Sequence, residues 1–241
     1  MELAEYRRMA EVEDVHWWYR STRALLRQLL EPSLPPGGRF LDVGCGTGAT
    51  GGWLGERGDL VAVDFEPQAL TLFGERHSSI GVIAADAGGL PLASDSFDAV
   101  LCVTVLCHRS IPDPSAVVRE LARVVRPGGV LCLWEPGVER LHRAHDRVTH
   151  TARRFSRRGL AGHIAAAGMT LERSTGAYSF LIPAAAVKTL VERGEVASDL
   201  DHHAGGLRGV LGGLASAERR LLRRADLPFG LSVVAVGRKP G

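Results

Sequence analysis

The chain has 241 residues, and 45% of them are hydrophobic, which is enough to bury a full core in one domain. Its formal charge is only +2, because 29 basic residues nearly balance 27 acidic ones, so neither nucleic acid nor an anionic membrane surface is indicated as a partner. The N-terminus lacks an apolar signal-peptide core, and no apolar run approaches the roughly 20 residues that span a bilayer. We therefore expect a cytoplasmic protein.

The first expected elements are a helical segment over residues 1–38, ended by a Pro-Gly run, and a buried strand over residues 39–43. Three glycines follow at positions 44, 46 and 48, and a helix-compatible segment runs from about Ala49 to Arg57. A turn without Cβ atoms lets a bulky ligand lie on the backbone, and a helix start offers that ligand free N–H donors. This strand-turn-helix unit is typical of nucleotide-binding sites.

Strands and helices alternate through the next hundred residues. We expect strands over residues 60–63, 81–85, 97–103 and 130–134, and helices that begin near 67 and span 114–125. The segment Arg126-Pro127-Gly128-Gly129 is predicted to stop the second helix before the strand that follows it. This alternation predicts an α/β protein with a doubly wound, mostly parallel sheet.

The remaining residues complete a single domain. We expect a polar helical stretch after residue 136, a helix over 156–167, strands over 169–178 and 231–236, and a helical insertion over about 181–229. This divides the chain into a helical cap (1–38), a core (39–136) and a substrate-side half (137–241). Added segments near strand ends set specificity on a shared scaffold, so the insertion is expected to select the substrate. Its apolar residues would line a pocket or form a homodimer contact.

Three strands end at an acidic residue. Asp42 ends the first, Asp64 the second and Asp86 the third. The carboxyl ends of parallel strands meet at one edge of the sheet, which is the edge where open α/β sheets bind ligands. Asp64 or Asp86 alone could cap the following helix, but three acids in succession favour a ligand site. Asp42 would repel a phosphate and attract a cation.

These motifs together resemble a class I S-adenosylmethionine-dependent methyltransferase. The resemblance rests on Leu41-Asp42-Val43-Gly44-Cys45-Gly46-Thr47-Gly48, on Asp64 and Asp86, and on Arg126-Pro127-Gly128-Gly129, in order and spacing. The flanks, His16-Trp17-Trp18-Tyr19-Arg20 and Leu227-Pro228-Phe229-Gly230, resemble a bacterial small-molecule subgroup of the type 11 kind. The resemblance implies a seven-stranded sheet and methyl transfer to oxygen, nitrogen or carbon of a small organic acceptor, plausibly in secondary metabolism.

The resemblance also implies cofactor-binding residues for S-adenosylmethionine. Asp64 would accept hydrogen bonds from the ribose hydroxyls, Asp86 from the adenine amino group, and Asp42 would lie near the ammonium group. An arginine of the N-terminal helix would pair with the methionine carboxylate, although that helix face could equally be solvated. The full expected set is Tyr19, Arg23, Asp42, Gly44, Cys45, Gly46, Asp64, Phe65, Asp86, Ala87, Val103 and Thr104.

A dinucleotide-dependent dehydrogenase is the structural rival, because Gly44-x-Gly46-x-x-Ala49 also fits the dinucleotide fingerprint. Against it, Asp42 would face a pyrophosphate and Asp86 would have no required role. A methyltransferase-like protein that binds cofactor without catalysis is a further alternative.

On the acceptor side, His108 is the candidate general base, and His108, His150 and Tyr178 are the candidate substrate residues. His142 and His145 share a helical face, and the run from 199 to 203 holds acids and histidines, but a solvated polar segment is the preferred interpretation of both. The cysteines have no zinc-ligand spacing, so we expect no metal and four free, buried thiols, at Cys45, Cys102, Cys107 and Cys132.

Overall fold

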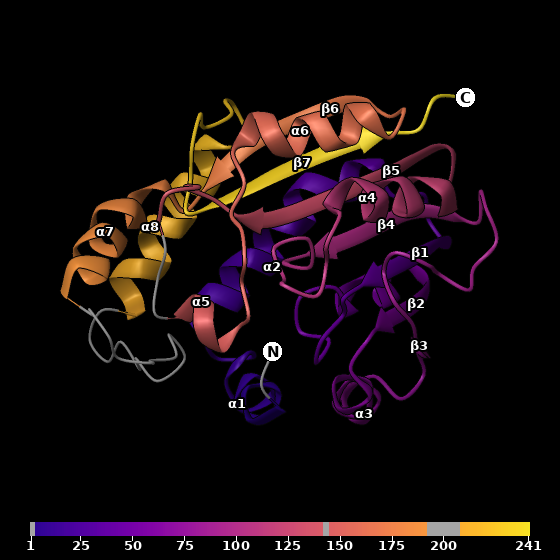
Figure 1. Cartoon of the computed structure of the whole chain (residues 1–241), viewed down its shortest axis with the longest axis horizontal. Helices are drawn as coiled ribbons and strands as arrows, with labels where there is room; N and C mark the ends of the chain where they lie inside the picture. Colours follow the sequence, from indigo (N-terminus) through magenta and orange to yellow (C-terminus); the bar gives the residue numbers. More distant parts are fainter. Residues whose placement is uncertain (1–2, 142–144, 192–207) are drawn as a thin grey trace.

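The computed structural model describes residues 3–141, 145–191 and 208–241. A seven-stranded sheet with helices on both faces forms its centre (Figure 1), which confirms the predicted α/β class. The strands are β1 (Gly38–Val43), β2 (Gly58–Asp64), β3 (Gly81–Ala84), β4 (Phe97–Val103), β5 (Val125–Pro136), β6 (Thr170–Ala177) and β7 (Ser232–Arg238). Their order across the sheet is β3-β2-β1-β4-β5-β7-β6.

The first five strands are parallel, so their carboxyl ends meet at one edge of the sheet. Strand β7 lies between β5 and β6 and runs antiparallel to both. Every residue of β4 is buried, as a central strand covered on both faces requires. The sheet therefore brings the ends of β1, β2 and β4 close together, which is the arrangement that the sequence predicts.

Helices cover the two faces of the sheet through separate apolar clusters. On one face, α4 (Pro114–Val124) and α6 (Arg157–Ala166) pack against inward-facing residues of β1, β4 and β5. On the other face, α2 (Trp17–Leu30) and α8 (Arg208–Leu221) pack beside each other and beneath Trp134 of β5. Helix α4 begins where expected, because Asp113 accepts a hydrogen bond from the Ser115 N–H at 2.8 Å ahead of it.

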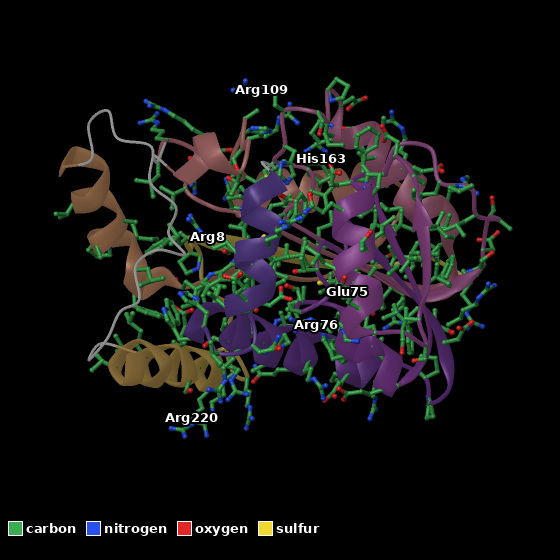
Figure 2. All side chains as sticks on the ribbon, turned by 90° about the horizontal axis from the view of Figure 1, so that it is seen from below. Arg8, Glu75, Arg76, Arg109, His163 and Arg220 are labelled. Carbon is green, nitrogen blue, oxygen red and sulfur yellow. The ribbon has the colours of Figure 1, made fainter. Side chains whose placement is uncertain are left out.

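The N-terminal cap is two helices, α1 (Leu3–Val12) and α2, with His16 as the N-cap residue of α2. Helix α1 lies beside α3 (Pro67–Arg76), as seen from below in Figure 2, where Arg76 is labelled. A short 3₁₀ turn, Glu31–Ser33, ends the cap before β1.

The prediction of a helix directly after the glycine turn is wrong. Residues 49–51 form a turn, and only a short 3₁₀ segment, Gly52–Glu56, follows. Glycine has a low helix propensity, and this stretch contains several. In addition, the Asp42 carboxylate lies against Gly51, where a Cβ would be 2.0 Å from its oxygen Oδ2. The ligand-facing backbone is thus a turn, with no helix N-terminus behind it.

Two other boundaries differ from the prediction. Strand β5 begins at Val125, so the Pro-Gly-Gly segment forms an irregularity within the strand, where Gly128 has a φ of +79°. The expected polar helix after residue 136 is reduced to α5 (His145–Val148) among the described residues.

The insertion before β7 contains the 3₁₀ turn Ser179–Leu181, α7 (Ile182–Val191) and α8. Figure 1 shows α5, α7 and α8 beyond the carboxyl ends of the parallel strands. The run from 199 to 203 and His142 lie outside the described residues. None of the helices described is long and apolar enough to cross a membrane.

Candidate functional site

A cavity of about 700 Å³ lies at the carboxyl ends of β1, β2 and β4. Its walls include most of the residues that the sequence predicts for the cofactor and the base. These are Tyr19, Asp42, Gly44, Cys45, Gly46, Asp64, Phe65, Asp86, Ala87, Val103, Thr104 and His108. Phe65 is 74% exposed, so one aromatic ring stands at the rim of the cavity.

The glycine turn is shaped by both conformation and crowding. Gly44 and Gly46 have φ values of +72° and +54°, in the left-handed region that favours glycine. A Cβ on Gly44 would lie 2.1 Å from the Val105 side chain, so the loop after β4 presses directly on the turn. The N–H groups of Gly44 and Cys45 donate to the Val63 carbonyl oxygen at 2.8 and 3.0 Å, which fixes the turn to β2.

Asp42 is the most unusual acid of the site. It is 2% exposed, and its oxygen Oδ2 is buried without a hydrogen-bond partner. Burial, with the Asp64 charge adding to it, raises the pKa of Asp42 to about 7. A buried carboxylate of this kind is stabilised by a cation or by N–H donors from a ligand.

Asp64 and Asp86 each hold a local turn as well as lining the cavity. Asp64 accepts hydrogen bonds from the N–H groups of Gly46 and Glu66, both at 2.9 Å, and burial raises its pKa. Asp86 accepts from the Gly88 N–H at 2.7 Å. The capping alternative is wrong for both acids, because Glu66, and not Asp64, is the N-cap residue of α3, and residues 87–96 after Asp86 are not helical.

A buried acid that the sequence did not predict as a site residue connects the cap to the glycine turn. Glu13, which is 1% exposed, accepts a hydrogen bond from the Thr47 hydroxyl at 2.5 Å and pairs with Arg76 at 2.8 Å. Burial nevertheless raises the pKa of Glu13. No local pattern marks Glu13, because its partners lie 34 and 63 residues further along the chain.

A second missed residue holds the loop that follows β4. Glu135 is 0% exposed, and its two carboxylate oxygens accept hydrogen bonds from the N–H groups of Val105, Leu106 and Cys107 at 2.8–3.1 Å. Burial raises the pKa of Glu135 to about 7. The signal existed in the sequence, because Glu135 ends an apolar strand just as Asp42 does.

His108 ends this loop and lines the cavity. Burial lowers its pKa to about 4, so the imidazole is neutral at pH 7 and can accept a proton. Thr104, at the start of the loop, has a φ of +55°, which is uncommon for a threonine and typical of constrained ligand sites.

Three expected site residues lie outside the cavity walls. Arg23 donates from Nη1 to the Ala49 carbonyl oxygen at 2.9 Å, and so supports the glycine turn from behind. Tyr178 is 2% exposed, with its hydroxyl 2.8 Å from that of Thr22, and is a core residue. His150 is exposed, with a φ of +53°. Arg23, Tyr178 and His150 thus lie apart from the cavity walls, and their expected roles at the cofactor and the substrate stay predictions from the sequence.

Metal-binding chemistry has no visible support in the part of the chain that the structure describes. Its residues contain no group of three His, Cys, Asp or Glu side chains that could hold a metal ion. The four cysteines are free and buried, as predicted.

The sequence and the fold are similar to those of known proteins. Residues 41–133 match a family model described as a methyltransferase domain. The chain is similar to a demethylmenaquinone methyltransferase from Mycobacterium marinum, with 40% identity over 49% of this chain and 48% of that protein. It is also similar to a ubiquinone biosynthesis O-methyltransferase from Xanthomonas axonopodis pv. citri, with 32% identity over 59% of this chain and 66% of that protein. The first alignment thus spans about half the length of the relative.

Among solved structures, the fold is similar to phosphoethanolamine N-methyltransferase 2 of Haemonchus contortus in complex with S-adenosyl-L-methionine. The TM-score is 0.60, with 18% identity, 92% of this chain covered and 53% of that chain covered. At this identity the likeness concerns the fold alone. The sequence match over residues 41–133 and the sheet order identify a domain of the class I S-adenosylmethionine-dependent methyltransferase kind in this chain.

Proposed function

We propose that this protein transfers a methyl group from S-adenosylmethionine to a small organic acceptor. The observation that carries the proposal is the buried acid Asp42, whose oxygen Oδ2 has no hydrogen-bond partner and which lines one cavity together with Asp64 and Asp86. Three acids around a glycine turn fit a ligand with an ammonium group, a ribose and an amino-bearing base, and disfavour a pyrophosphate. The names of the relatives support the same reaction class.

The cofactor would be held by residues that line the cavity. Asp42 would pair with its ammonium group, Asp64 with its ribose hydroxyls and Asp86 with its adenine amino group. Gly44 and Gly46 would let its amino-acid portion lie against the backbone, and Phe65 would cover the base at the rim. When bound, it supplies an electrophilic methyl group on a sulfonium, so that the sulfur–carbon bond breaks as the bond to the acceptor forms.

The protein's own contribution to the reaction is mainly positioning. An in-line displacement with a neutral leaving group is accelerated by holding the two reacting atoms collinear in a dry pocket. Val103 ends the central strand at this point, Thr104 begins the loop that follows, and Glu135 fixes this loop. His108 would accept the proton when the acceptor atom is a hydroxyl or an acidic carbon, and neutrality at pH 7 suits it to that role.

Calorimetric titration with S-adenosylmethionine and, separately, with NAD tests the cofactor. We expect binding of the first alone; tight binding of NAD without S-adenosylmethionine would replace this proposal with the dehydrogenase alternative. An acceptor screen read by mass spectrometry then identifies the substrate and the methylated atom together. Complete lack of turnover in a cofactor-binding protein would favour the non-catalytic alternative. A cytoplasmic location and a homodimer stay predictions from the sequence.

A further inference from the structure

The cavity has two parts with different chemistry. The part at β1, β2 and β3 holds Asp42, Asp64 and Asp86, which we assign to the cofactor. Across the sheet from it, beyond β4, the walls come from α2, the loop after β4, residues 146–154, α7, α8 and the start of β7. We call this second part the acceptor end.

The walls of the acceptor end are mostly apolar. They include the indole rings of Trp17 and Trp18 and the side chains of Ile111, Leu181 and Leu231. Such walls bind a ligand by removing apolar surface from water, and they offer little to a strongly hydrated group.

Among the described residues that line the acceptor end, the arginine and the aspartate form one ion pair. Arg154 is the one arginine or lysine among the described residues that line the cavity, and its guanidinium binds the Asp146 carboxylate with two hydrogen bonds of 3.1 and 2.6 Å. The side chains of Arg154 and Asp146 are only 4% and 11% exposed. Arg154 Nη1 also donates to the Gly137 carbonyl oxygen at 3.1 Å. The pair is thus fixed in place, and its two opposite charges balance.

Two histidines also line the cavity. His16 accepts the Trp18 N–H at its Nδ1, at 3.3 Å. Burial lowers the pKa of His108 to about 4, so its ring is neutral at pH 7.

We propose that the methyl acceptor of this protein is an uncharged, mostly apolar molecule, selected because the Asp146–Arg154 pair neutralises the acceptor end. This inference rests on the proposed function. A carboxylate, phosphate or ammonium entering here would lose its water without meeting an opposite charge, which is costly in an apolar site. Polar atoms of an uncharged acceptor can still bond to the Thr149 and Thr151 hydroxyls, which lie 2.9 Å apart in the wall.

Three probes with the same apolar body test this selection: 2-naphthylmethanol, 2-naphthoate and 2-naphthylmethylammonium. Each is titrated by calorimetry at pH 7 into protein saturated with S-adenosylhomocysteine. We expect the alcohol to bind at least about tenfold more tightly than either ion. This difference in affinity corresponds to only a modest part of the free-energy cost of burying a charge. Equal or tighter binding of either ion, or no binding of the alcohol, would overturn the proposal.

The variant Asp146→Asn tests the neutralising pair itself. Removing the carboxylate leaves the Arg154 charge uncompensated. We therefore expect the affinity for 2-naphthoate to increase about tenfold relative to that for the alcohol, and the affinity for the ammonium probe to decrease further. The matched control is Asp226→Asn, because Asp226 also pairs with an arginine, Arg173, at 2.7 Å, but lies outside the cavity walls. The control should keep the wild-type order of affinities. An unchanged order in Asp146→Asn would contradict the inference.

The same titrations separate failure of this inference from failure of the proposed function. Loss of S-adenosylhomocysteine binding by the wild-type protein would contradict the function itself. Retained binding together with a preference for a charged probe would contradict the inference alone. Retained binding in Asp146→Asn shows that the variant is folded.

Discussion

At the scale of single residues, the site contains two acids that are almost completely buried, Asp42 and Glu135. Asp42 and Glu135 both have pKa values raised to about 7 by burial, yet only Glu135 has hydrogen-bond donors for both of its oxygens. Asp42 lines the cavity that we assign to the cofactor, and its oxygen Oδ2 has no hydrogen-bond partner. A buried acid with partners from its own chain holds structure, whereas one without them is available to a ligand.

The first prediction concerns Asp42→Asn. Loss of a charged hydrogen bond of about 1.5–3 kcal/mol should weaken S-adenosylmethionine binding by about 10- to 100-fold. Because the pKa of Asp42 is raised to about 7 and only the ionised form attracts a cation, wild-type affinity should increase as the pH rises from 6 to 8. The variant should lose this pH dependence. Calorimetry at the two pH values measures both effects.

The control for this experiment is Asp59→Asn, which removes a solvent-exposed acid that pairs with Arg39 at 3.4 Å. Exposed ion pairs contribute little, so this variant should bind the cofactor as the wild type does. Unchanged affinity and pH dependence in Asp42→Asn would remove Asp42 from the cofactor site.

The second prediction concerns His108→Ala. If His108 is the general base, the variant should lower kcat by about a hundredfold or more while the cofactor affinity stays nearly the same. The control is His163→Ala, because His163 lies outside the cavity walls, where its Nδ1 is 3.0 Å from the Ser115 hydroxyl. Single-turnover kinetics with the identified acceptor measures the effect. Unaltered turnover in His108→Ala would show that His108 lines the cavity without acting as the general base.

At the scale of elements, the end of β5 determines the shape of the loop after β4. Glu135 reaches across to three consecutive backbone N–H groups of this loop, and Val105 of the same loop presses on the glycine turn after β1. Three strand ends are therefore coupled through one carboxylate. The cap adds a further link, because Glu13 joins it to Thr47 and Arg76.

The third prediction follows for Glu135→Gln. A glutamine has only one acceptor oxygen, so a buried N–H of the loop loses its partner, which costs about 1–3 kcal/mol of unfolding free energy. The pKa of Glu135 is raised above its unfolded value, so its stabilising contribution is complete below about pH 4.5 and decreases as the pH rises through about 7. The loss caused by the substitution should thus be larger at pH 5 than at pH 8. Urea unfolding at both values measures it.

An exposed glutamate provides the comparison for this experiment. Glu172 pairs with Arg238 at the surface, and Glu172→Gln should change the unfolding free energy by about 0–1 kcal/mol at either pH. A loss in Glu135→Gln that is no greater than this, or that grows from pH 5 to pH 8, would contradict the role given to Glu135.

At the scale of the whole molecule, the cavity joins segments from nearly the full length of the chain. Tyr6 of α1, the strand ends of the core, and Leu231 before β7 all line it. A ligand that fills this cavity binds the folded state alone, and so it should stabilise the whole domain.

The fourth prediction tests this coupling. S-adenosylmethionine at 100 times its Kd should add about 2.7 kcal/mol to the unfolding free energy. For a chain of this size, that corresponds to an increase in Tm of roughly 5–10 °C. NAD at the same concentration should leave Tm unchanged. Differential scanning calorimetry measures both, and an increase with NAD alone would favour the dehydrogenase alternative.

The sequence by itself determined the framework of this protein. The strands, the left-handed glycines and the acids at the strand ends are local patterns, because they depend on residues that are close in the chain. Parallel strand order then places Asp42, Asp64 and Asp86 at one edge, whatever the rest of the chain does. Glu135 could have been recognised in the same way, as an acid that ends an apolar strand.

Only the tertiary structure decided which side chains reach the cavity. Tyr178 lies in the core because its hydroxyl meets Thr22, 156 residues earlier in the chain, and Arg23 turns to the Ala49 carbonyl oxygen. Glu13 is buried where it bonds to Thr47 and Arg76, and Asp146 pairs with Arg154 within the acceptor end. Such partners are set by packing between distant segments, and no local pattern of residue types encodes them.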